Sequence, residues 1–375
     1  MSSDVTRAPA SAGLRVAVAG GGLGGLCLAQ GLRRAGIEVR VFERSAGRPQ
    51  GYRLHIDTRA GQALEACLPP GLFELVLATA GQPGHAFSVL SRRLRVRHRT
   101  QGDPAAFSTS VDRGTLREIL SRGLDDAISY DSEVTGFEAG ADGVTVRLAD
   151  GGTFRADVLV GADGVHSAVR RALVPSAPVE DTGTRVIYGK TPLDDAVRAH
   201  LPPALRDGFV AIVGGHVGLA TGLVEFRQPP AEFGLRPAAD YLMWGLSARL
   251  DRFPPLDGLG PAGLHAVARR KTRFWHRDVR ALLGAATTDE TFLVRVRSSV
   301  RIPAWLPSRV TLLGDAIHAM SPAGGSGANI ALMDAANLTA ALSGAGPEVV
   351  PAIAAYERSL RDYGFAAVEA ARRRG

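Results

Sequence analysis

The 375-residue sequence contains only two cysteines, Cys27 and Cys67. A chain with so little cysteine has no disulfide framework and suits a reducing compartment, so we expect a cytoplasmic protein. Cys27 falls within an apolar helical pattern, and we interpret it as a small core residue rather than a nucleophile. No group of cysteines and histidines has the spacing of metal ligands, and no metal site is expected.

Long apolar runs are also absent. No stretch approaches the ~18–20 apolar residues that a membrane-spanning helix needs, so we expect no membrane partner. Residues 1–13 are small, polar and proline-bearing. They lack the apolar centre of a signal peptide, and we interpret them as a disordered lead-in. The length is sufficient for two domains with cores of their own.

Lysine is scarce as well: of the 44 basic residues, only Lys190 and Lys271 are lysines, and the formal net charge is +7. The positive charge is scattered along the chain, which argues against nucleic acid as a partner. The densest run, Arg92–Arg99, alternates and predicts a strand with one basic face. We interpret it as a solvated edge strand, with attraction of an anionic cofactor or substrate as the alternative.

The first structured segment has the pattern of a strand–helix–strand unit. Arg15–Ala19 reads as a short buried strand, Leu23–Ala35 has an apolar helical pattern, and Ile37–Phe42 is rich in β-branched residues. A βαβ unit of about thirty residues is typical of dinucleotide-binding domains.

The turn of this unit matches G-x-G-x-x-G. Gly20 permits a tight turn, Gly22 lets a diphosphate approach the backbone, and Gly25 lets helix and strand pack closely. Glu43 ends the second strand, where a carboxylate can accept hydrogen bonds from an adenosine ribose. The motif does not separate NAD(P) from FAD. Arg44 fits an NADP 2′-phosphate, the ribose of a FAD site, or a solvated surface.

Two later segments repeat the order strand, turn, helix. Val158–Val160 is a buried strand followed by Asp163, and Val310–Leu313 is a buried strand followed by Asp315. Open α/β sheets bind ligands at the carboxyl ends of their strands. The loop SPAGGSGAN at Ser321–Asn329 is built mostly from backbone and leaves room for a flat ligand. The helix after it aims its positive end at the loop.

Between these segments, residues 181–295 change character. The expected strands are Arg185–Thr191, Phe209–Val213, Val217–Arg227 and Tyr241–Ser247, and the expected helices are Leu264–Lys271 and Arg277–Leu283. This pattern predicts a separate antiparallel sheet backed by helices. The region has no phosphate loop, and we assign it to the substrate. Earlier in the chain, Asp112 is a plausible N-cap, which places Arg113 in the first turn of a helix.

Four segments together resemble the single-component (class A) FAD-dependent aromatic hydroxylases, the class typified by para-hydroxybenzoate hydroxylase. Gly20–Gly25 with Glu43 is similar to the FAD fingerprint of that family. GADGVHSAVR at 161–170 resembles its "DG" motif, which those enzymes use for both FAD and the nicotinamide cofactor. Residues 312–335 resemble its "GD" motif and flavin loop. VDRGTL at 111–116 is similar to the arginine-bearing helix start near the FAD diphosphate.

The resemblance covers nearly the whole chain and implies an α/β fold. It implies a Rossmann-like FAD-binding domain of the GR2 type, the para-hydroxybenzoate hydroxylase fold, with an inserted antiparallel-sheet substrate domain. We expect the FAD-binding domain at 1–80, 101–180 and 296–342, and the substrate domain at 81–100 and 181–295. Residues 343–375 would form a C-terminal helical segment.

The resemblance also implies roles for individual residues. The glycine turn would cradle the diphosphate, Glu43 would bind the ribose, and the flavin loop would line the isoalloxazine ring. Arg53 is a weaker candidate, because its segment GYRLHID departs from the glycine–isoleucine pattern of many relatives. The implied cofactor-binding residues are Gly20, Gly22, Leu23, Gly24, Gly25, Glu43, Arg44, Arg53, Arg113, Val134, Asp163, Gly314, Asp315, Pro322, Gly325, Gly327, Ala328 and Asn329.

The implied reaction is that of a FAD-dependent monooxygenase. NADPH or NADH would reduce tightly but non-covalently bound FAD and leave. O₂ would then give a C4a-hydroperoxide, whose distal oxygen hydroxylates an aromatic or polycyclic small molecule. Flavin-dependent epoxidation or another oxidoreductase reaction on the same fold is the alternative. Two other readings stay open at this point: a nicotinamide-dependent dehydrogenase, and a non-catalytic flavin-binding protein. A monomer or homodimer is expected.

No catalytic acid or base can be named from the sequence. His318 lies in the GD segment, where the family often has a histidine with a structural role in the turn. His55, Tyr188 and His216 are polar residues that could face a pocket, although a core or surface position is favoured for each.

Overall fold

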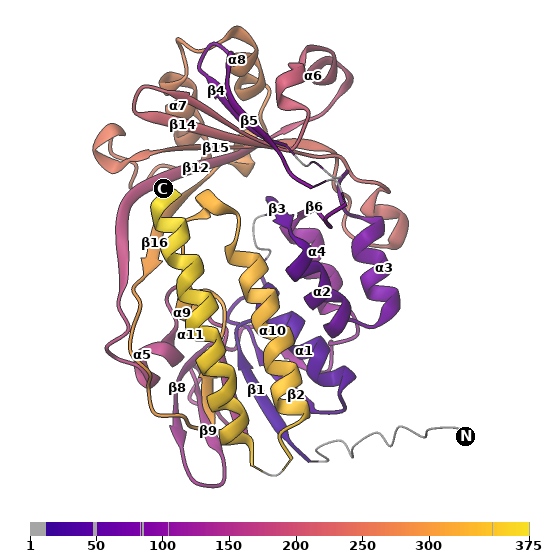
Figure 1. The fold of residues 1–375 in the computed structure, drawn as a ribbon, viewed down its shortest axis with the longest axis vertical. Coiled ribbons are helices and arrows are strands. Elements are labelled where there is room, and N and C mark those ends of the chain that lie inside the picture. Colours follow the sequence, from indigo (N-terminus) through magenta and orange to yellow (C-terminus); the bar gives the residue numbers. More distant parts are fainter. Residues whose placement is uncertain are drawn as a thin grey trace.

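The computed structural model describes residues 13–47, 51–82, 84, 86–103, 105–346 and 348–374. Figure 1 shows its two main parts, one above the other. A seven-stranded sheet with small helices forms the upper part, and a five-stranded sheet with long helices forms the lower part. Two short strands, β3 (Arg53–Ile56) and β6 (Thr109–Asp112), lie between them.

The lower sheet is parallel throughout, with the strand order β17-β11-β1-β2-β7. Its central strands, β1 and β11, are apolar and buried along almost their whole length, as parallel strands covered on both faces are. The strand bounds are β1 Arg15–Ala19, β2 Glu38–Phe42, β7 Ile128–Ser129, β11 Val158–Gly161 and β17 Val310–Leu312.

Helices pack beside this sheet and a small antiparallel sheet adjoins it. Helix α1 packs on α10 and α2, and α10 packs on α11 (Figure 1). The helices of this part are α1 Leu23–Arg34, α2 Thr58–Cys67, α3 Pro70–Ala78, α4 Arg113–Ser121, α5 Ala168–Leu173, α9 Asp315–His318, α10 Gly327–Ser343 and α11 Val349–Arg374. The small sheet has strands β8 Val134–Ala139, β9 Val144–Leu148 and β10 Thr153–Ala156.

The upper sheet has the strand order β16-β12-β15-β14-β13-β4-β5, and all its neighbours are antiparallel except β4 and β13. Its strands are β4 Ala86–Ser91, β5 Val96–Gln101, β12 Val179–Pro192, β13 Phe209–Gly214, β14 Val217–Val224, β15 Tyr241–Arg249 and β16 Phe292–Ser299. The helices beside it are α6 Asp195–His200, α7 Pro261–Lys271 and α8 Arg277–Gly284.

The two faces of the upper sheet differ. One face buries Ile212, Trp244 and Leu246 against Leu264 of α7 and Val279 of α8. On the other face, cross-strand register groups a different set of side chains, since directly opposite residues point to the same side. This second face, which we call the cleft face, carries Tyr188, Phe209, Ala220, Gly222, Met243 and Gly245.

The first βαβ unit and the helices predicted at residues 264 and 277 are confirmed. The predicted alternating strand at Arg92–Arg99 is partly wrong, because residues 92–93 form a turn and Leu94 has φ 59°. The strand starts at Val96, is exposed along its whole length and lies at the sheet edge. The solvated edge-strand interpretation is thereby confirmed. The predicted strand Val217–Arg227 ends earlier, at Val224.

The strand positions bear on the predicted domains without fixing their boundaries. Strands β4 and β5 join the upper sheet although the chain between β5 and β12 builds the lower part. Strand β16 extends to Ser299, four residues beyond the predicted end of the substrate domain at residue 295. The division into domains stays a prediction. Among the described residues, no helix has both the length and the apolar character for crossing a bilayer.

Glu357 on α11 is a buried acid with a predictable pH effect. Its Oε1 accepts hydrogen bonds from Trp305 Nε1 at 3.1 Å and Thr311 Oγ1 at 2.8 Å. Burial raises the pKa of this carboxyl to about 7 from the ordinary 4.5. The folded state therefore holds a proton that the unfolded state has lost, and the free energy of unfolding falls as pH rises from 4.5 to about 7.

We expect Glu357→Gln to raise the free energy of unfolding by about 3 kcal/mol at pH 8 and by little at pH 4.5. Glutamine keeps the accepting oxygen and carries no charge to bury. Denaturant unfolding at both pH values measures this. Glu369→Gln is the matched control on the same helix, because Glu369 is an exposed partner of Arg301 at 2.7 Å. An equal change at both pH values would contradict the assignment.

Candidate cofactor site and active-site cleft

The carboxyl ends of four parallel strands meet at one edge of the lower sheet. Phe42, Ala19, Gly161 and Leu312 lie side by side in register. The residues that follow them are therefore brought together: the glycine turn after β1, Glu43 after β2, the DG segment after β11 and the GD segment after β17. This is the edge at which open α/β sheets bind ligands.

The three motif glycines of the first turn are required for different reasons. Gly20 has φ +107°, and an added Cβ would lie 2.4 Å from the Ala162 carbonyl oxygen. A Cβ on Gly25 would lie 2.1 Å from the Gly20 carbonyl oxygen. A Cβ on Gly22 would meet no described atom within 4 Å. Packing therefore excludes side chains at Gly20 and Gly25, whereas Gly22 borders open space at the start of α1.

Glu43 is held beside this turn by backbone donors. The Gly21 N–H donates to Glu43 Oε2 at 2.8 Å, and the Ser45 N–H donates to Oε1 at 3.1 Å. Each carboxylate oxygen keeps a further lone pair that can accept a hydroxyl hydrogen. Arg44 is exposed next to it, and Val134 is buried at the start of β8.

Arg117 on α4 belongs to this cluster and was missed from the sequence. Its Nε donates to the Gly21 carbonyl oxygen at 2.9 Å, and its Nη2 lies 3.9 Å from Glu43 Oε2. The sequence did contain a signal for Arg117. Residues four apart lie on the same helix face, and Arg113, four residues earlier, was already a candidate. The guanidinium of Arg113 itself lies over the Tyr52 ring, 5.6 Å from its centroid.

Asp163 presents an unsatisfied carboxylate oxygen to the same edge. Its Oδ2 accepts the N–H groups of Ala168 at 2.7 Å and Val169 at 3.2 Å, which ties the DG turn to α5. Its Oδ1 is buried and has no hydrogen-bond partner among the described residues. A buried carboxylate oxygen without a donor is costly, so it points to a hydroxyl or amide of a bound group.

The GD segment places Asp315 in front of the start of α10. Gly314 has φ +61°, and an added Cβ on Gly327 would lie 3.9 Å from Asp315 Oδ1. The Asp315 side chain is exposed, yet the protein around it raises the pKa of its carboxyl, against the lowering effects of His318 and Arg113. The exposure of Asp315 leaves its carboxylate open to a ligand.

The loop before α10 is fixed by Asn329. Its Oδ1 accepts the Asp57 N–H at 3.0 Å, and its Nδ2 donates to the carbonyl oxygens of His55 and Gly325, both at 2.9 Å. Gly325 has φ +62°, and Pro322 and Ala328 lie on either side of it. Asn329 thus ties the loop at Gly325 to the residues around β3, while an added Cβ on Gly325 would meet no described atom within 4 Å.

His318 is buried behind this edge and does not face it. Its Nε2 lies 2.6 Å from Asp334 Oδ2, and the Tyr363 hydroxyl donates to Asp334 Oδ1 at 2.7 Å. Burial lowers the pKa of His318, but the Asp334 carboxylate more than offsets this, and the pKa lies above its ordinary value. The geometry fits the structural role expected for this histidine.

The comparisons with known proteins agree with this geometry. The family model described as "FAD binding domain" matches residues 13–198 and 265–368, more than half of the chain. Aurachin C monooxygenase/isomerase of Stigmatella aurantiaca is 30% identical over 88% of this chain and 81% of that protein. The chain belongs to the family of FAD-dependent monooxygenases.

Other family members extend the comparison. The dual O-methyltransferase/FAD-dependent monooxygenase CTB3 of Cercospora beticola is 35% identical over 92% of this chain but only 44% of its own length. The chain thus spans less than half the length of the first curated relatives that it matches. A Photorhabdus luminescens structure, provisionally described as a FAD-containing monooxygenase, is 31% identical with TM-score 0.84 and covers 95% of this chain and 96% of its own.

The fold is shared with more distant relatives. Klebsiella pneumoniae HpxO, whose structure was solved with FAD and uric acid, has TM-score 0.82 and 24% identity over 97% of this chain and 88% of its own. Family membership confirms the resemblance to the single-component aromatic hydroxylases and the fold class expected from the sequence. FAD is the cofactor of the family, and the residues at the sheet edge fit it: the open Gly22 backbone, the free lone pairs of Glu43 and the unpaired Asp163 oxygen.

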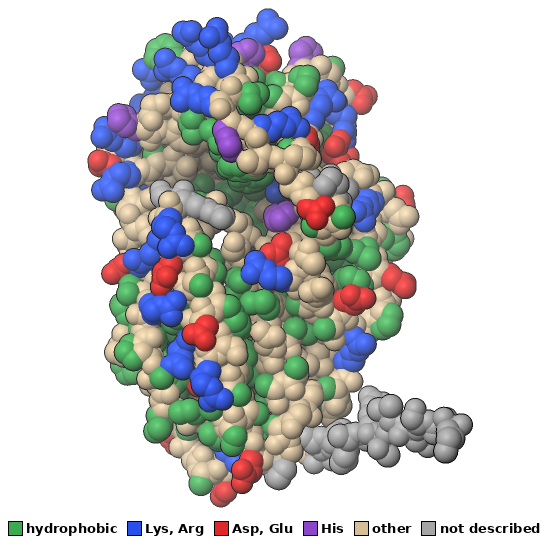
Figure 2. Space-filling view, viewed as in Figure 1, with side chains coloured by type: hydrophobic (Ala, Val, Ile, Leu, Met, Phe, Trp, Pro, Cys, Tyr) green, Lys and Arg blue, Asp and Glu red, His purple; other side chains and the backbone are tan. Residues whose placement is uncertain are grey.

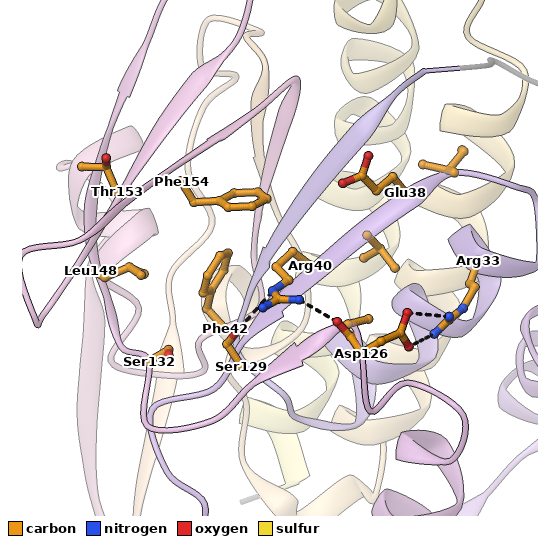
Figure 3. A pocket seen from close by; sticks show the side chains of 13 residues that line it. Arg33, Glu38, Arg40, Phe42, Asp126, Ser129, Ser132, Leu148, Thr153 and Phe154 are labelled. Atoms are coloured by element: carbon orange, nitrogen blue, oxygen red, sulfur yellow. Dashed lines mark hydrogen bonds and ion pairs between the residues drawn. The ribbon is translucent and has the colours of Figure 1, made fainter.

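A pocket of about 480 Å³ lies elsewhere, on the outer side of β2 and β7 (Figure 3). Its arginines are already engaged, because Arg33 makes two hydrogen bonds to Asp126, at 2.7 and 2.8 Å, and Arg40 donates to Ser129 Oγ and the Asp126 carbonyl oxygen. The pocket therefore offers a ligand few free donors, and we do not assign a family role to it.

A hollow separates the upper and lower parts of the molecule (Figure 2). Tyr188 stands on the cleft face and stacks on Tyr52 and on Phe292, with ring centroids 5.8 Å and 5.4 Å apart. The Tyr52 and Phe292 centroids are 6.1 Å apart, so the three rings form one cluster. His55 is half-buried on β3 with Nε2 3.0 Å from Ser108 Oγ. His216 lies in an exposed turn. Of these three candidates, only Tyr188 contributes to the aromatic wall of the cleft face.

Proposed function

We propose that the protein is a FAD-dependent monooxygenase that uses NAD(P)H and O₂ to insert one oxygen atom into an aromatic or polycyclic small molecule. The observation that carries this proposal is the meeting of the glycine turn, Glu43, Asp163 and Asp315 at one edge of the lower sheet, below an aromatic cleft face. The relatives include a zeaxanthin epoxidase of rice, 32% identical over 92% of this chain. Epoxidation therefore stays as the alternative outcome.

The chain's own residues would hold FAD as follows. The first N–H groups of α1 have no intrahelical acceptor and would bind the diphosphate beside Gly22. Glu43 would accept the ribose hydroxyls, with Arg117 fixing its carboxylate. Arg113, Asp163 and Asp315 would hold the ribityl and diphosphate groups. When bound, FAD supplies the redox chemistry, taking up reducing equivalents and activating O₂.

The start of α10 would serve the flavin ring. The N-terminal N–H groups of this 17-residue helix carry a partial positive charge, which stabilises negative charge on the ring. Pro322, Gly325, Gly327, Ala328 and Asn329 would line the ring. The cleft face would cover the substrate and exclude water from the reacting atoms.

We further propose that NAD(P)H docks in a basic pocket next to the DG segment. The pocket measures about 430 Å³ and is lined by His166, Arg295 and Arg297, with Asp257 as its acid. Asp257 is paired with Arg295. Burial and then the charges of Arg297 and Arg44 lower the pKa of His166, which reflects the excess positive charge here. Such a field attracts the phosphates of a dinucleotide.

A cytoplasmic location is also proposed. It fits the two cysteines, Cys27 and Cys67, which are both free and buried. Small-molecule substrate and O₂ are the proposed partners.

The visible absorption spectrum of the protein purified without added cofactor tests the proposed function. We expect flavin bands that bleach on addition of NADPH or NADH without O₂ and return when O₂ is admitted. Acid release and chromatography should identify FAD. A colourless protein that also fails to take up FAD would overturn the proposal. Bound FAD that neither nicotinamide reduces would leave a flavin-binding protein without this activity.

A further inference from the structure

Arg53 reaches from between the two parts of the molecule onto the cleft face. It belongs to β3, and its Nε donates to the Leu223 carbonyl oxygen on β14 at 3.0 Å. An added Cβ on Gly222 would lie 2.8 Å from Arg53 Cδ and 2.9 Å from Nε. Gly222 therefore lacks a side chain where the arginine crosses the sheet, and the guanidinium lies flat against β14.

This guanidinium is buried without an anionic partner. Arg53 is 9% exposed, and burial lowers its pKa to about 10. Among the described residues, no carboxylate forms an ion pair with it, and Nη1 and Nη2 have no acceptor. Neither atom is among the fully buried atoms without a partner, so both reach open space. A buried cation without a counter-charge is unfavourable, and such groups mark binding sites.

The other cation on the same face is already paired. Lys190 Nζ lies 3.3 Å from Asp112 Oδ2 and 3.9 Å from Glu290 Oε1. The Tyr241 hydroxyl donates to the same Asp112 oxygen at 2.9 Å. Asp112 is thus fully used by Lys190, Tyr241 and the start of α4. Arg53 is the cation that these groups leave uncompensated.

The surface beside Arg53 is flat and bordered by aromatic rings. In the row next to Gly222, the cross-strand register places Ala211, Ala220 and Gly245 on the cleft face. The Tyr188 ring covers Gly245, where an added Cβ would lie 3.0 Å from Tyr188 Cε1, so Ala211 and Ala220 are left as a floor of small residues. Phe209 lies next to this floor in the Gly222 row and stacks on Phe87 with the ring centroids 6.2 Å apart. A planar ring system fits such a floor, with its edge directed at the guanidinium.

We propose that Arg53 binds an anionic oxygen of the substrate, a carboxylate or an ionised ring hydroxyl, while the ring system lies on the floor of Ala211 and Ala220 beside Tyr188. This inference rests on the proposed function, because it names the substrate class of the same cleft. The planar fork of arginine makes two parallel hydrogen bonds to a carboxylate, and a desolvated site strengthens them. Arg53 is then a specificity-determining substrate residue, in place of the weaker cofactor role expected from the sequence.

The test uses the FAD-bound protein and two probes of equal shape. These are 3-hydroxy-2-naphthoate and its uncharged amide, 3-hydroxy-2-naphthamide, titrated against the flavin absorption spectrum to give Kd values. Arg53→Met removes the charge, and Arg53→Lys keeps it if the methionine variant does not fold. Arg280→Gln on the opposite face of the sheet is the matched control for lost positive charge. The Kd of FAD is measured for each variant.

We expect the unaltered protein to bind the acid at least tenfold more tightly than the amide. Arg53→Met should weaken acid binding at least tenfold and amide binding less than threefold, with the FAD Kd changed less than threefold. Arg53→Lys should keep part of the preference for the acid, and Arg280→Gln should keep all of it.

If the unaltered protein binds the acid no more tightly than the amide, or does not bind it at all, the inference is overturned. A loss of FAD affinity in Arg53→Met that matches the probe effect returns Arg53 to the cofactor and also overturns it. If the unaltered protein does not bind FAD, that result contradicts the proposed function itself and not only the role of Arg53.

Discussion

The variant Gly25→Ala is expected to lower the free energy of unfolding by about 3 kcal/mol or more, whereas Gly22→Ala is expected to lower it by less than about 1 kcal/mol. The added methyl group on Gly25 would lie 2.1 Å from the Gly20 carbonyl oxygen and 3.3 Å from Ala162 Cβ. Neither neighbour can yield without separating α1 from β1. The methyl group on Gly22 meets no atom within 4 Å, and φ −77° with ψ −178° suits any residue.

For FAD binding, we expect Gly22→Ala to have the large effect that it lacks on the free energy of unfolding. Gly22→Ala fills the open space in which we propose the diphosphate, so its FAD Kd should rise at least tenfold although the fold is kept. Denaturant unfolding of the apoprotein and titration of FAD by fluorescence quenching measure the two quantities separately.

Gly260→Ala provides the matched control. Gly260 is also the N-cap of a helix, α7, with φ −75°, ψ 177° and no atom within 4 Å of an added Cβ. It should reproduce the small stability change of Gly22→Ala and leave the FAD Kd unchanged. Unaltered FAD affinity in Gly22→Ala would contradict the placement of the diphosphate at this turn.

Local sequence patterns predicted the elements that hold the cofactor edge. The βαβ unit from Arg15 to Phe42 combines short-range signals: a buried apolar strand, a helical period and a glycine turn. Asp112 was predicted as an N-cap for the same reason, and its Oδ1 accepts the N–H groups of Gly114 and Thr115. Such features depend on residues within one turn or one strand, and a single sequence contains them.

Contacts between distant segments were not predictable in this way. The register that lets Arg53 cross to Leu223 joins residues 170 positions apart, and Asn329 reaches His55 over 274 positions. Composition and spacing carry no signal for such pairs. The long strand β12 illustrates the same limit: only its part from residue 185 was predicted, because the polar start before the irregularity between Asp181 and Arg185 reads as a loop.

His318 shows why the residue type alone is a poor guide to a catalytic role. A histidine three residues after Asp315 could act as a base, and only the packing of α10 and α11 decides otherwise. Its ring meets the backbone of Gly364, where an added Cβ would lie 2.9 Å from the ring, and Asp334 faces its Nε2. The cofactor edge is thus supported from behind by a buried ion pair.

The variant Asp334→Ala is expected to lower the free energy of unfolding by about 3 to 5 kcal/mol. Asp334 is fully buried, and its carboxylate accepts the Gly314 N–H at 2.8 Å in addition to His318 and the Tyr363 hydroxyl. Alanine would leave three donors without this acceptor, of which the Gly314 N–H and His318 are buried. Because one of these is the Gly314 N–H, the turn that presents Asp315 should loosen and the FAD Kd should rise. Asp362→Ala, at an exposed position on α11, is the control and should change neither quantity.

The pH dependence separates the charge of Asp334 from its size. The pKa of His318 is raised in the folded state, so the stability from the pair is fully present below the ordinary value of 6.5 and is lost as pH rises through the folded value. The free energy of unfolding should therefore fall as pH rises above 6.5, and measuring it in the Glu357→Gln background removes the contribution of that acid. Asp334→Asn keeps the shape without the charge and should flatten this fall. A slope that Asp334→Asn leaves unchanged would mean that His318 is neutral in the fold and that Asp334 acts only as a hydrogen-bond acceptor.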